Sequence, residues 1–562
     1  MTPLIEYRRW RPCEKPVAEG LEEAGRRHVV RRLWSKDFTL WKSADREISN
    51  RLGWLEAPER AVFRMERWLS LAAEINNFEI EKAVLLGMGG SSLAPEVFSR
   101  AFRRAADSPE LIVQDSTVPE AVKRLQDRLI PEKALFLVSS KSGTTLETLS
   151  LYRYFYEWME RRLGPEKTGR HFLAITDSGT PLEEIARRRG FLAVLPGEPD
   201  IGGRFSVFSA FGLFSAALLG LDVRDILRRA GEMSLKCREE AAAAGNPGLH
   251  LGVTLGRLAA LGIDKLMLVL PPEIESFGAW LEQLIAESTG KEGRGILPVC
   301  GEPPSEFNLG REDSLWAVFR FKGEPSADRS LARLDAAGKP HLLFTLESAA
   351  DLAGQFFLWE TAVAVAGWSL GINPFDQPDV AASKKNTEDM LDRRLAAGGF
   401  PDEEDGFVNE SEAASAIVDF SGLGRPGDYI GLQAFLAPGR ETDRLLGEIA
   451  DALRSRTRLP VTWGYGPRFL HSTGQLHKGD GGRGLFIQFS AEDTEDLLLP
   501  REAGDGLRGG LSFGVIKDAQ ARGDFQALRR AGRRVMRIRL TGNPPPSLEK
   551  ILANFRYEKA RS

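Results

Sequence analysis

The sequence predicts an α/β protein built from doubly wound parallel sheets. From residue 83 onward, short apolar runs alternate with amphipathic stretches, and most of the runs end in a polar turn. Strands of a parallel sheet are covered on both faces, so they read as continuous apolar segments, and helices connect them. The alternation restarts twice along the chain, which indicates three α/β units.

The elements follow in order. Residues 1–80 show helical spacing with charged faces and predict an N-terminal helical cap. In residues 81–240, the first unit, the predicted strands are AVLLG, LIVQD, ALFLVSS, FLAITD and FLAVLP. In residues 241–400, the second unit, they are KLMLVL, WAVFRF and HLLFTL. An acidic, glycine-containing stretch opens residues 401–562, the C-terminal unit, whose predicted strands are DYIGLQAFL, VTWGYG, GLFIQFS and VMRIRL, with a helix at 441–457.

The composition excludes several classes of partner. The 75 Lys and Arg residues against 79 Asp and Glu give a net charge of −4, which argues against a nucleic-acid or membrane-surface binder. The longest uncharged stretch, 205–221, is too short for a membrane span and predicts a buried helix. The three cysteines cannot form a disulfide framework, and the first thirty residues lack a secretory signal, so we expect a cytoplasmic protein.

The run ALFLVSSKSGTTLET predicts an anion site. A buried strand leads into a turn of small hydroxyl residues, and a helix follows. The hydroxyls of Ser140, Ser142, Thr144 and Thr145, with the unpaired N–H groups of the helix start, can bind a phosphate, and Lys141 adds a positive charge. The alternative is an ordinary helix cap, but a cap needs only one such residue.

A second turn, LLGMGGSSLAP at 85–95, also follows a strand and opens a helix. It matches a dinucleotide fingerprint only in part, because the third glycine would fall at Ser92. A small phosphosugar therefore fits better than a dinucleotide. Both turns follow strands of one sheet, and parallel sheets bind ligands at the carboxyl ends of their strands.

Three further segments carry candidate polar groups. Gln283 and Glu287 lie four residues apart on one face of a helix, and Glu287 occupies its last turn, where a cation is normally preferred. The alternative is an exposed glutamate paired with Lys291. Arg204 precedes a long apolar stretch, so it needs a ligand or an ion-pair partner. The loop after GWSLGINPF carries Gln377, with Lys384 beyond it, and either a site or structural loop chemistry explains it.

Together these segments resemble the glucose-6-phosphate isomerases. The motifs GMGGSSLAP, SSKSGTTLET, GGRFSVFSAFG, ESTGKEGRG and NPFDQPDVAASK occur in that family's order. The chain is most similar to the isomerase half of bacterial transaldolase/glucose-6-phosphate isomerase fusions, a likeness that extends to RLWSKDFTLW and GPRFLHSTGQLHKG. A transaldolase barrel of about 250 residues does not fit before the first motif. We therefore expect an isomerase without the partner enzyme.

The resemblance implies two sugar-isomerase domains with the active site between them. It implies phosphate binding by Ser140, Ser142 and Thr145, with Lys141 and Thr144 beside them. It also implies substrate contacts from Ser91, Gly203, Gln283 and Gln377. Glu287 matches the base that shuttles the proton, Arg204 matches the cation that stabilises the enediolate, and Lys384 matches the lysine of the last motif.

One departure from the family concerns the histidine that opens the sugar ring. That histidine lies between the Glu and Lys motifs, where this chain has only His341, directly before a predicted strand and more typical of a structural residue. His471 and His477 lie in a polar turn of the C-terminal unit. We hypothesise that His471 opens the ring together with Lys384; the alternative is a merely structural turn.

The expected function is reversible isomerisation of glucose 6-phosphate and fructose 6-phosphate through a cis-enediol, without cofactor or metal. The six histidines show no two-ligand helical spacing beside a carboxylate. The alternatives are a non-catalytic phosphosugar-binding regulator and an isomerase of mannose 6-phosphate or an amido sugar. Related isomerases are usually dimers, so a homodimer is one expectation, although the added C-terminal unit can alter or replace that contact.

Overall fold

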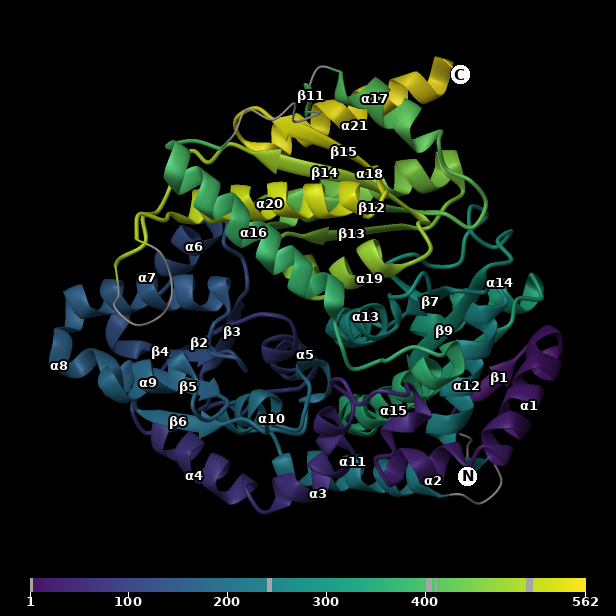
Figure 1. Cartoon of the computed structure of the whole chain (residues 1–562), viewed down its shortest axis with the longest axis horizontal. Helices are drawn as coiled ribbons and strands as arrows, with labels where there is room; N and C mark the ends of the chain where they lie inside the picture. Colours follow the sequence, from purple (N-terminus) through teal and green to yellow (C-terminus); the bar gives the residue numbers. More distant parts are fainter. Residues whose placement is uncertain (1–3, 240–244, 401–406, 410–411, 502–508, 562) are drawn as a thin grey trace.

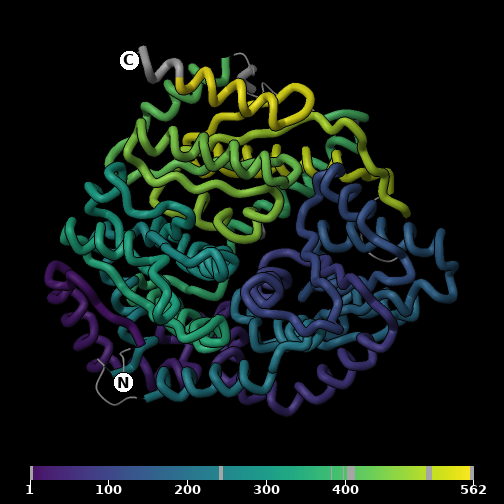
Figure 2. Tube along the Cα trace, turned by 180° about the vertical axis from the view of Figure 1, so that it is seen from behind, coloured from purple at the N-terminus to yellow at the C-terminus, as the bar shows by residue number. Residues whose placement is uncertain are grey.

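The computed structural model describes residues 4–239, 245–400, 407–409, 412–501 and 509–561. Within these residues the chain forms three five-stranded sheets, each with its own helices. The sheet of the C-terminal unit lies across the other two, so that all three units meet near the centre of the molecule (Figure 1). Figure 2 shows the same three-way arrangement from behind.

The first unit contains a wholly parallel sheet with the strand order β3-β2-β4-β5-β6. Its strands are β2 (Lys82–Gly87), β3 (Glu110–Gln114), β4 (Ala134–Ser139), β5 (Phe172–Thr176) and β6 (Ala193–Pro196). Its helices are α5 (Leu93–Ala101), α6 (Pro119–Gln126), α7 (Leu146–Leu163), α8 (Pro165–Thr168), α9 (Pro181–Arg188), α10 (Ala210–Leu218) and α11 (Val223–Arg238). The chain leaves β2 for one edge and returns to β4 on its other side, so the topological switch point lies between β2 and β4.

The second unit has the strand order β1-β10-β9-β7-β8. Its strands are β7 (Lys265–Val269), β8 (Leu297–Cys300), β9 (Ser314–Phe321) and β10 (His341–Leu346), joined by β1 (Glu6–Arg8). Its helices are α12 (Pro247–Ala260), α13 (Glu275–Thr289), α14 (Asp328–Ala336) and α15 (Leu352–Leu370). The strands β7 to β10 are parallel, whereas β1 pairs antiparallel with β10.

The sequence predicted a purely helical N-terminal segment. That prediction is wrong in one respect, because β1 extends the sheet of the second unit. The helices of the segment are α1 (Arg11–Arg26), α2 (Val29–Trp34), α3 (Ala57–Val62) and α4 (Met65–Asn76). Helix α1 packs on α12 of the second unit, whereas α4 packs on α10 of the first. The segment thus joins the two units rather than covering one end.

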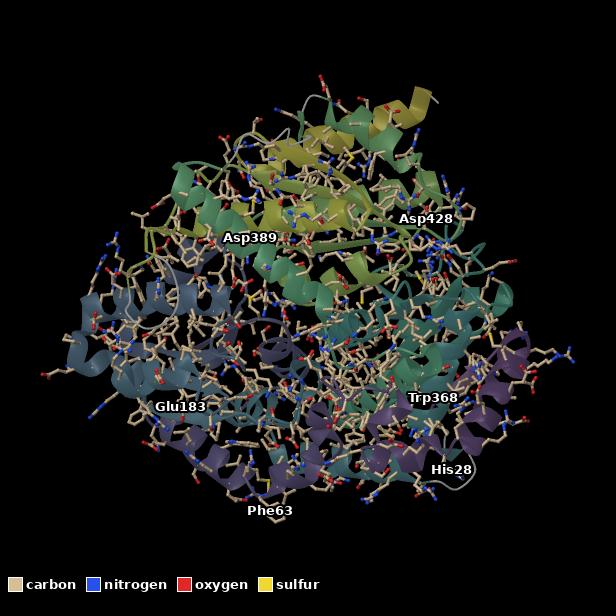
Figure 3. The ribbon with its side chains drawn as sticks, viewed as in Figure 1. His28, Phe63, Glu183, Trp368, Asp389 and Asp428 are labelled. Carbon is tan, nitrogen blue, oxygen red and sulfur yellow. The ribbon has the colours of Figure 1, made fainter. Side chains whose placement is uncertain are left out.

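The C-terminal unit has the parallel strand order β11-β15-β14-β12-β13. Its strands are β11 (Phe407–Asn409), β12 (Tyr429–Phe435), β13 (Val461–Tyr465), β14 (Gly484–Ala491) and β15 (Arg534–Leu540). Its helices are α17 (Ala413–Ser421), α18 (Arg440–Thr457), α19 (Gly474–Gly479), α20 (Phe513–Arg530) and α21 (Pro544–Arg561). Helix α16 (Pro378–Ala397) crosses from the second unit and packs along α20; Asp389 marks its exposed side (Figure 3).

The predicted α/β class with parallel sheets is confirmed. The apolar runs became strands because they are buried on both faces, as in β4, where every residue is buried. The uncharged stretch 205–221 contains the fully buried helix α10. Among the described residues, no helix has the length and hydropathy that a bilayer span requires.

Candidate functional site

The turn after β4 forms a compact cradle of hydroxyl groups. Ser140 Oγ lies 2.9 Å from Thr145 Oγ1, and Ser142 Oγ lies 3.0 Å from Thr144 Oγ1. Thr145 is the N-terminal cap residue of α7, so the N–H groups of that helix's first turn open toward the cradle. Ser142 Oγ also accepts a hydrogen bond from the Thr144 N–H at 3.3 Å. Hydroxyl groups can rotate to donate to an anion, and the positive end of the helix dipole favours an anion there.

The Lys141 side chain points elsewhere. Its Nζ donates to Asp177 Oδ2 at 2.6 Å and to the Glu198 carbonyl at 2.7 Å. Burial lowers the pKa of the Lys141 ammonium, while Asp177 opposes that shift. Its charge is already matched inside the protein, so hydroxyl and N–H groups make up the cradle in this structure.

The glycine turn after β2 lies beside this cradle, at the switch point of the sheet. Ser139 Oγ, at the end of β4, donates to the Ser91 carbonyl at 3.3 Å. Ser206 lies two residues after Arg204, and its Oγ donates to the Gly90 carbonyl at 3.4 Å. The two turns and the Gly203–Phe205 helical turn η7 therefore meet, as the predicted site requires.

Gly90 allows this close approach because it has no side chain. A Cβ placed on Gly90 would overlap the backbone carbonyl of Gly203, which cannot move aside as a flexible side chain can. We expect Gly90→Ala to lower the free energy of unfolding by about 1–3 kcal/mol and to abolish most activity. Denaturant unfolding and initial rates measure both effects.

Gly231→Ala is the matched control. Gly231 lies inside helix α11 with nothing within 4 Å of an added Cβ, so alanine should raise stability by roughly 0.5–1 kcal/mol and leave the rate unchanged. If the two alanine variants have the same stability and initial rate, the close approach of Gly90 to Gly203 is not required for folding or activity.

Arg204 and Glu287 face one another in the interior. Arg204 Nη1 lies 3.8 Å from Glu287 Oε1, and both side chains are about 5% exposed or less. Arg204 Nη2 donates to the Phe375 carbonyl at 2.7 Å, whereas Nη1 has no hydrogen-bond partner among the described residues. A carboxylate and a guanidinium with an unused donor thus share one buried place, where charges act more strongly than in water.

Gln283 links this pair to the glycine turn and to the C-terminal unit. One turn before Glu287 on α13, its Nε2 donates to Glu287 Oε2 at 3.0 Å and to the His471 carbonyl at 2.8 Å. A Cβ on Gly89 would lie 2.6 Å from Gln283 Nε2, so the glycine turn packs on the same amide. The alternative of an exposed Glu287 paired with Lys291 is wrong, because Glu287 is buried.

His471 enters the site from the C-terminal unit on the helical turn η12 (Arg468–His471). Its Nε2 lies 2.9 Å from Glu147 Oε1, which also accepts a hydrogen bond from Gln520 Nε2 at 2.7 Å. Burial opposes ionisation of Glu147, but His471 outweighs it and, with a smaller effect of Lys384, holds the pKa of this carboxyl below its ordinary value. A carboxylate that holds one ring nitrogen fixes the orientation of the imidazole.

Glu147 and Gln520 were not predicted from the sequence. Glu147 follows the cradle by two residues, and an acidic residue in the first turn of a helix is favourable for the dipole alone. Gln520 lies on α20, 373 residues from its partner, so no local pattern connects them.

Gln377 and Lys384 lie on the exposed side of the site. Gln377 is the N-terminal cap residue of α16, and both side chains are exposed. Lys384 lies close enough to Glu147 to favour its ionised form. The helix therefore brings a cation toward the Glu147–His471 pair, from the side opposite the buried base.

The other two histidines discussed above are structural. His341 is fully buried at the start of β10, where its Nδ1 contacts the Lys339 carbonyl at 3.0 Å. His477 is buried on α19, and its Nδ1 lies 3.4 Å from Gln433 Nε2. Within the described residues, neither side chain contacts Glu287 or Arg204, whereas the His471 carbonyl accepts a hydrogen bond from Gln283, the partner of Glu287.

Comparison with known proteins finds relatives over much of the chain. Residues 68–294 match the family model for phosphoglucose isomerase. A glucose-6-phosphate isomerase of Symbiobacterium thermophilum is 29% identical over 391 residues, which cover 60% of this chain and 86% of that protein. One from Staphylococcus saprophyticus is 27% identical over 407 residues, covering 64% and 89%. The chain is thus similar to glucose-6-phosphate isomerases over 60–64% of its length.

Two solved structures share the fold. A hypothetical protein of Thermus thermophilus superposes with a TM-score of 0.59 at 25% identity, covering 69% of this chain and 99% of that one. A glucose-6-phosphate isomerase of Chlamydia trachomatis gives a TM-score of 0.52 at 20% identity, covering 70% and 81%. Nearly a third of this chain thus has no counterpart in the Thermus protein. The closer likeness to transaldolase fusions stays a prediction.

The family-model match and these relatives support phosphosugar isomerisation by this chain. Within the described ranges, no three His, Cys, Asp or Glu side chains gather as a metal site would need. The residues nearest the buried pair are Gln283, Lys291 and the loop carbonyls of Phe375 and Asp376.

Lys291 supports the loop that holds Arg204. Its Nζ donates to the carbonyl and to Oδ1 of Asp376 at 2.6 and 2.7 Å, and the Asp376 carbonyl also accepts from Arg204. Burial, and then Arg204, lowers the pKa of the Lys291 ammonium to about 8. Lys291 is therefore charged at neutral pH and loses its proton as the pH rises through about 8.

We expect kcat/KM to fall as the pH rises through about 8, because neutral Lys291 releases Asp376 and with it Arg204. The stability effect has the opposite sign. An unfolded lysine titrates near pH ~10.4, so between about 8 and 10 the unfolded chain binds more protons and this linkage raises the unfolding free energy. Lys291→Arg keeps the charge and should remove the inflection. Superimposable pH profiles of the two proteins would contradict this role.

Proposed function

We propose that this chain interconverts glucose 6-phosphate and fructose 6-phosphate through a cis-enediol, with Glu287 as the base. The single observation that carries the proposal is the buried pair of Glu287 Oε1 and Arg204 Nη1, 3.8 Å apart. An aldose and a ketose interconvert when a proton moves between neighbouring carbons and a second proton moves between their oxygens. One carboxylate can perform the carbon transfer while a cation stabilises the developing oxyanion.

In this mechanism Glu287 removes the proton from C2 of the aldose and returns it to C1. The electron pair of the broken C–H bond forms the C1–C2 double bond, and the carbonyl oxygen takes the negative charge. Arg204 Nη1, which has no hydrogen-bond partner among the described residues, is available to that oxygen. The Gln283 hydrogen bond to Glu287 Oε2 leaves Oε1 to act as the base.

The phosphate on C6 and the reacting carbons C1 and C2 lie at opposite ends of the open-chain substrate, and ring opening needs a further acid–base group. The hydroxyls of Ser140, Ser142, Thr144 and Thr145 and the N–H groups of α7 support phosphate binding, beside the glycine turn with Ser91. His471, held by Glu147, is the acid–base group for ring opening, with Lys384 nearby. Ring opening transfers a proton to the ring oxygen and removes one from the anomeric hydroxyl.

Solvent exchange tests the route. Glucose 6-phosphate labelled with deuterium at C2 is incubated with the enzyme in ordinary water, and the label in fructose 6-phosphate is measured by NMR. Proton transfer through Glu287 predicts partial loss of the label to solvent, because a carboxylic acid exchanges its proton. Complete retention at C1 over many turnovers indicates a hydride shift and refutes the enediol route.

The same assay separates the alternatives. A phosphosugar-binding regulator binds glucose 6-phosphate and turns over none of it. An isomerase of mannose 6-phosphate converts that sugar to fructose 6-phosphate faster than it converts glucose 6-phosphate. The buried Glu287 is the feature that favours an enzyme, because binding alone needs no base beside the cation.

A further inference from the structure

A large cavity lies between the first unit and the C-terminal unit, beside α13. Its volume is about 850 Å³. All of the edge strand β3 and the two residues after it line the cavity, together with Trp463–Gly466 at the end of the edge strand β13 and with Ala279 and Glu282 of α13. The cavity therefore lies between the edges of two sheets. The proposed function uses none of its polar side chains.

The inner end of the cavity holds more carboxylates than cations. Arg468 pairs with Asp115 at 3.0 Å and with Glu96. Glu282 has no cation within 4 Å among the described residues, and its hydrogen bond from Ser472 Oγ is 3.4 Å long. Burial raises the pKa of the Glu282 carboxyl to about 7. An unpaired carboxyl in a cavity wall is available to accept hydrogen bonds from a ligand's hydroxyl groups.

Four arginines of the first unit also line the cavity: Arg100, Arg104, Arg124 and Arg128. Arg100 pairs with Glu96 at 3.1 Å. Arg124 and Arg128 are about half exposed, and their acidic partners lie 3.7 and 3.5 Å away. Exposed pairs of this kind contribute little, about 0–1 kcal/mol. A phosphate dianion, which guanidinium groups bind with paired hydrogen bonds, can displace them.

The C-terminal unit provides an aromatic wall. Trp463 and Tyr465 of β13 line the cavity, and their ring centroids are 5.8 Å apart at an interplanar angle of 88°. The Tyr465 hydroxyl donates to Asp443 Oδ1 at 2.6 Å, which fixes the ring. Aromatic rings combine an apolar face with a polar edge, so they suit ligands with both C–H and hydroxyl groups.

We propose that this interdomain cavity is a second ligand site, which binds a phosphorylated sugar or polyol with its phosphate on Arg124 and Arg128 and its hydroxyls toward Glu282 and Asp115. The carboxylates accept hydrogen bonds from the ligand's hydroxyl groups, the aromatic wall covers the carbon chain, and the arginines neutralise the phosphate. A cavity of this size encloses a hexose phosphate together with bridging water.

The site also has a route to the isomerase centre, and this step rests on the proposed function. The turn η12 carries Arg468, at the inner end of the cavity, and His471, which contacts Glu147. Helix α13 carries Glu282 on one side and Gln283 and Glu287 on the other. A ligand that pairs with Asp115 and Glu282 changes the partners of Arg468, and therefore the placement of His471. The second site is thus an effector site.

Equilibrium dialysis with sorbitol 6-phosphate tests the binding step. This probe has the phosphate and the hydroxyls but no carbonyl, so the enzyme cannot convert it. The parent should bind two molecules per chain, one in each site. Arg124→Ala/Arg128→Ala should bind one, with at least tenfold weaker binding at the second site, and Ser142→Ala/Thr145→Ala should bind one by losing the cradle.

One molecule per chain in the parent, lost in the cradle variant, overturns the proposal, as do two molecules in the double arginine variant. These results do not depend on turnover, so they separate this proposal from the proposed function. The effector step is tested with initial rates at fructose 6-phosphate concentrations near KM. Sorbitol 6-phosphate should change the rate of the parent at least twofold beyond the purely competitive inhibition of the double arginine variant, in which only the active site binds it; equal inhibition of the two proteins refutes the effector role.

Discussion

Glu287→Gln is expected to lower kcat for fructose 6-phosphate by at least about a hundredfold. Glutamine preserves the shape of the side chain and its contact with Gln283, but it cannot take a proton from carbon. The side chains that bind the phosphate are unchanged in this variant, so the KM or the dissociation constant of the substrate should change little. A coupled assay for glucose 6-phosphate, with substrate binding by calorimetry, measures both quantities.

Glu275→Gln is the control for this experiment. Glu275 lies in the first turn of the same helix and is exposed, so its loss should leave the rate within about twofold of the parent. A Glu287→Gln enzyme that retains the parent rate would falsify the single-base mechanism. Loss of both binding and rate would instead indicate that Glu287 holds the interior together rather than acting as a base.

His471→Ala is expected to reduce kcat/KM for cyclic substrate by roughly a hundredfold, because general acid–base catalysis of ring opening is lost. The substitution should matter much less for erythrose 4-phosphate, whose phosphorylated O4 cannot close the usual ring. Deuterium exchange next to its carbonyl, followed by NMR in D2O, measures the base without the ring-opening step. The ratio of the two losses separates ring opening from a general effect on the site.

Glu147→Gln completes this comparison. The amide keeps the size of the side chain but removes the charge that His471 and Lys384 favour, so the imidazole loses the carboxylate that orients it. We expect a smaller loss of kcat/KM for cyclic substrate than in His471→Ala. If His471→Ala converts cyclic substrate as fast as the parent, His471 is part of a structural turn.

The buried strands of the first unit were predictable because a strand covered on both faces shows no competing pattern. Three short strands were missed: β1, β8 and β11, the last of which spans only Phe407–Asn409. β8 spans four residues and contains Pro298, and β1 has three residues, Glu6–Arg8, that are only half buried at a sheet edge. Sequences this short carry no period, and pairing with β10 rather than local preference makes β1 a strand.

The candidate site also has parts that were predictable from local sequence and parts that were not. Ser140 to Thr145 and Gly89 to Ser91 act within single turns, so their residue types were sufficient to predict a cradle. The direction of the Lys141 side chain was not predictable, because Asp177 reaches it from the next strand. The contact of His471 with Glu147 depends on how the C-terminal unit sits on the first, which no local pattern encodes.

The position of His471 in the third unit along the chain also affects the order in which the proposed site is completed during synthesis. The buried pair of Glu287 and Arg204 can assemble once the first two units have left the ribosome. In the proposed mechanism, however, ring opening requires η12, and Gln520 on α20 must dock onto Glu147 to complete its surroundings. That mechanism therefore predicts that a nascent chain with only its first two units folded binds phosphosugar without opening the ring, and that ring opening begins once α20 has folded.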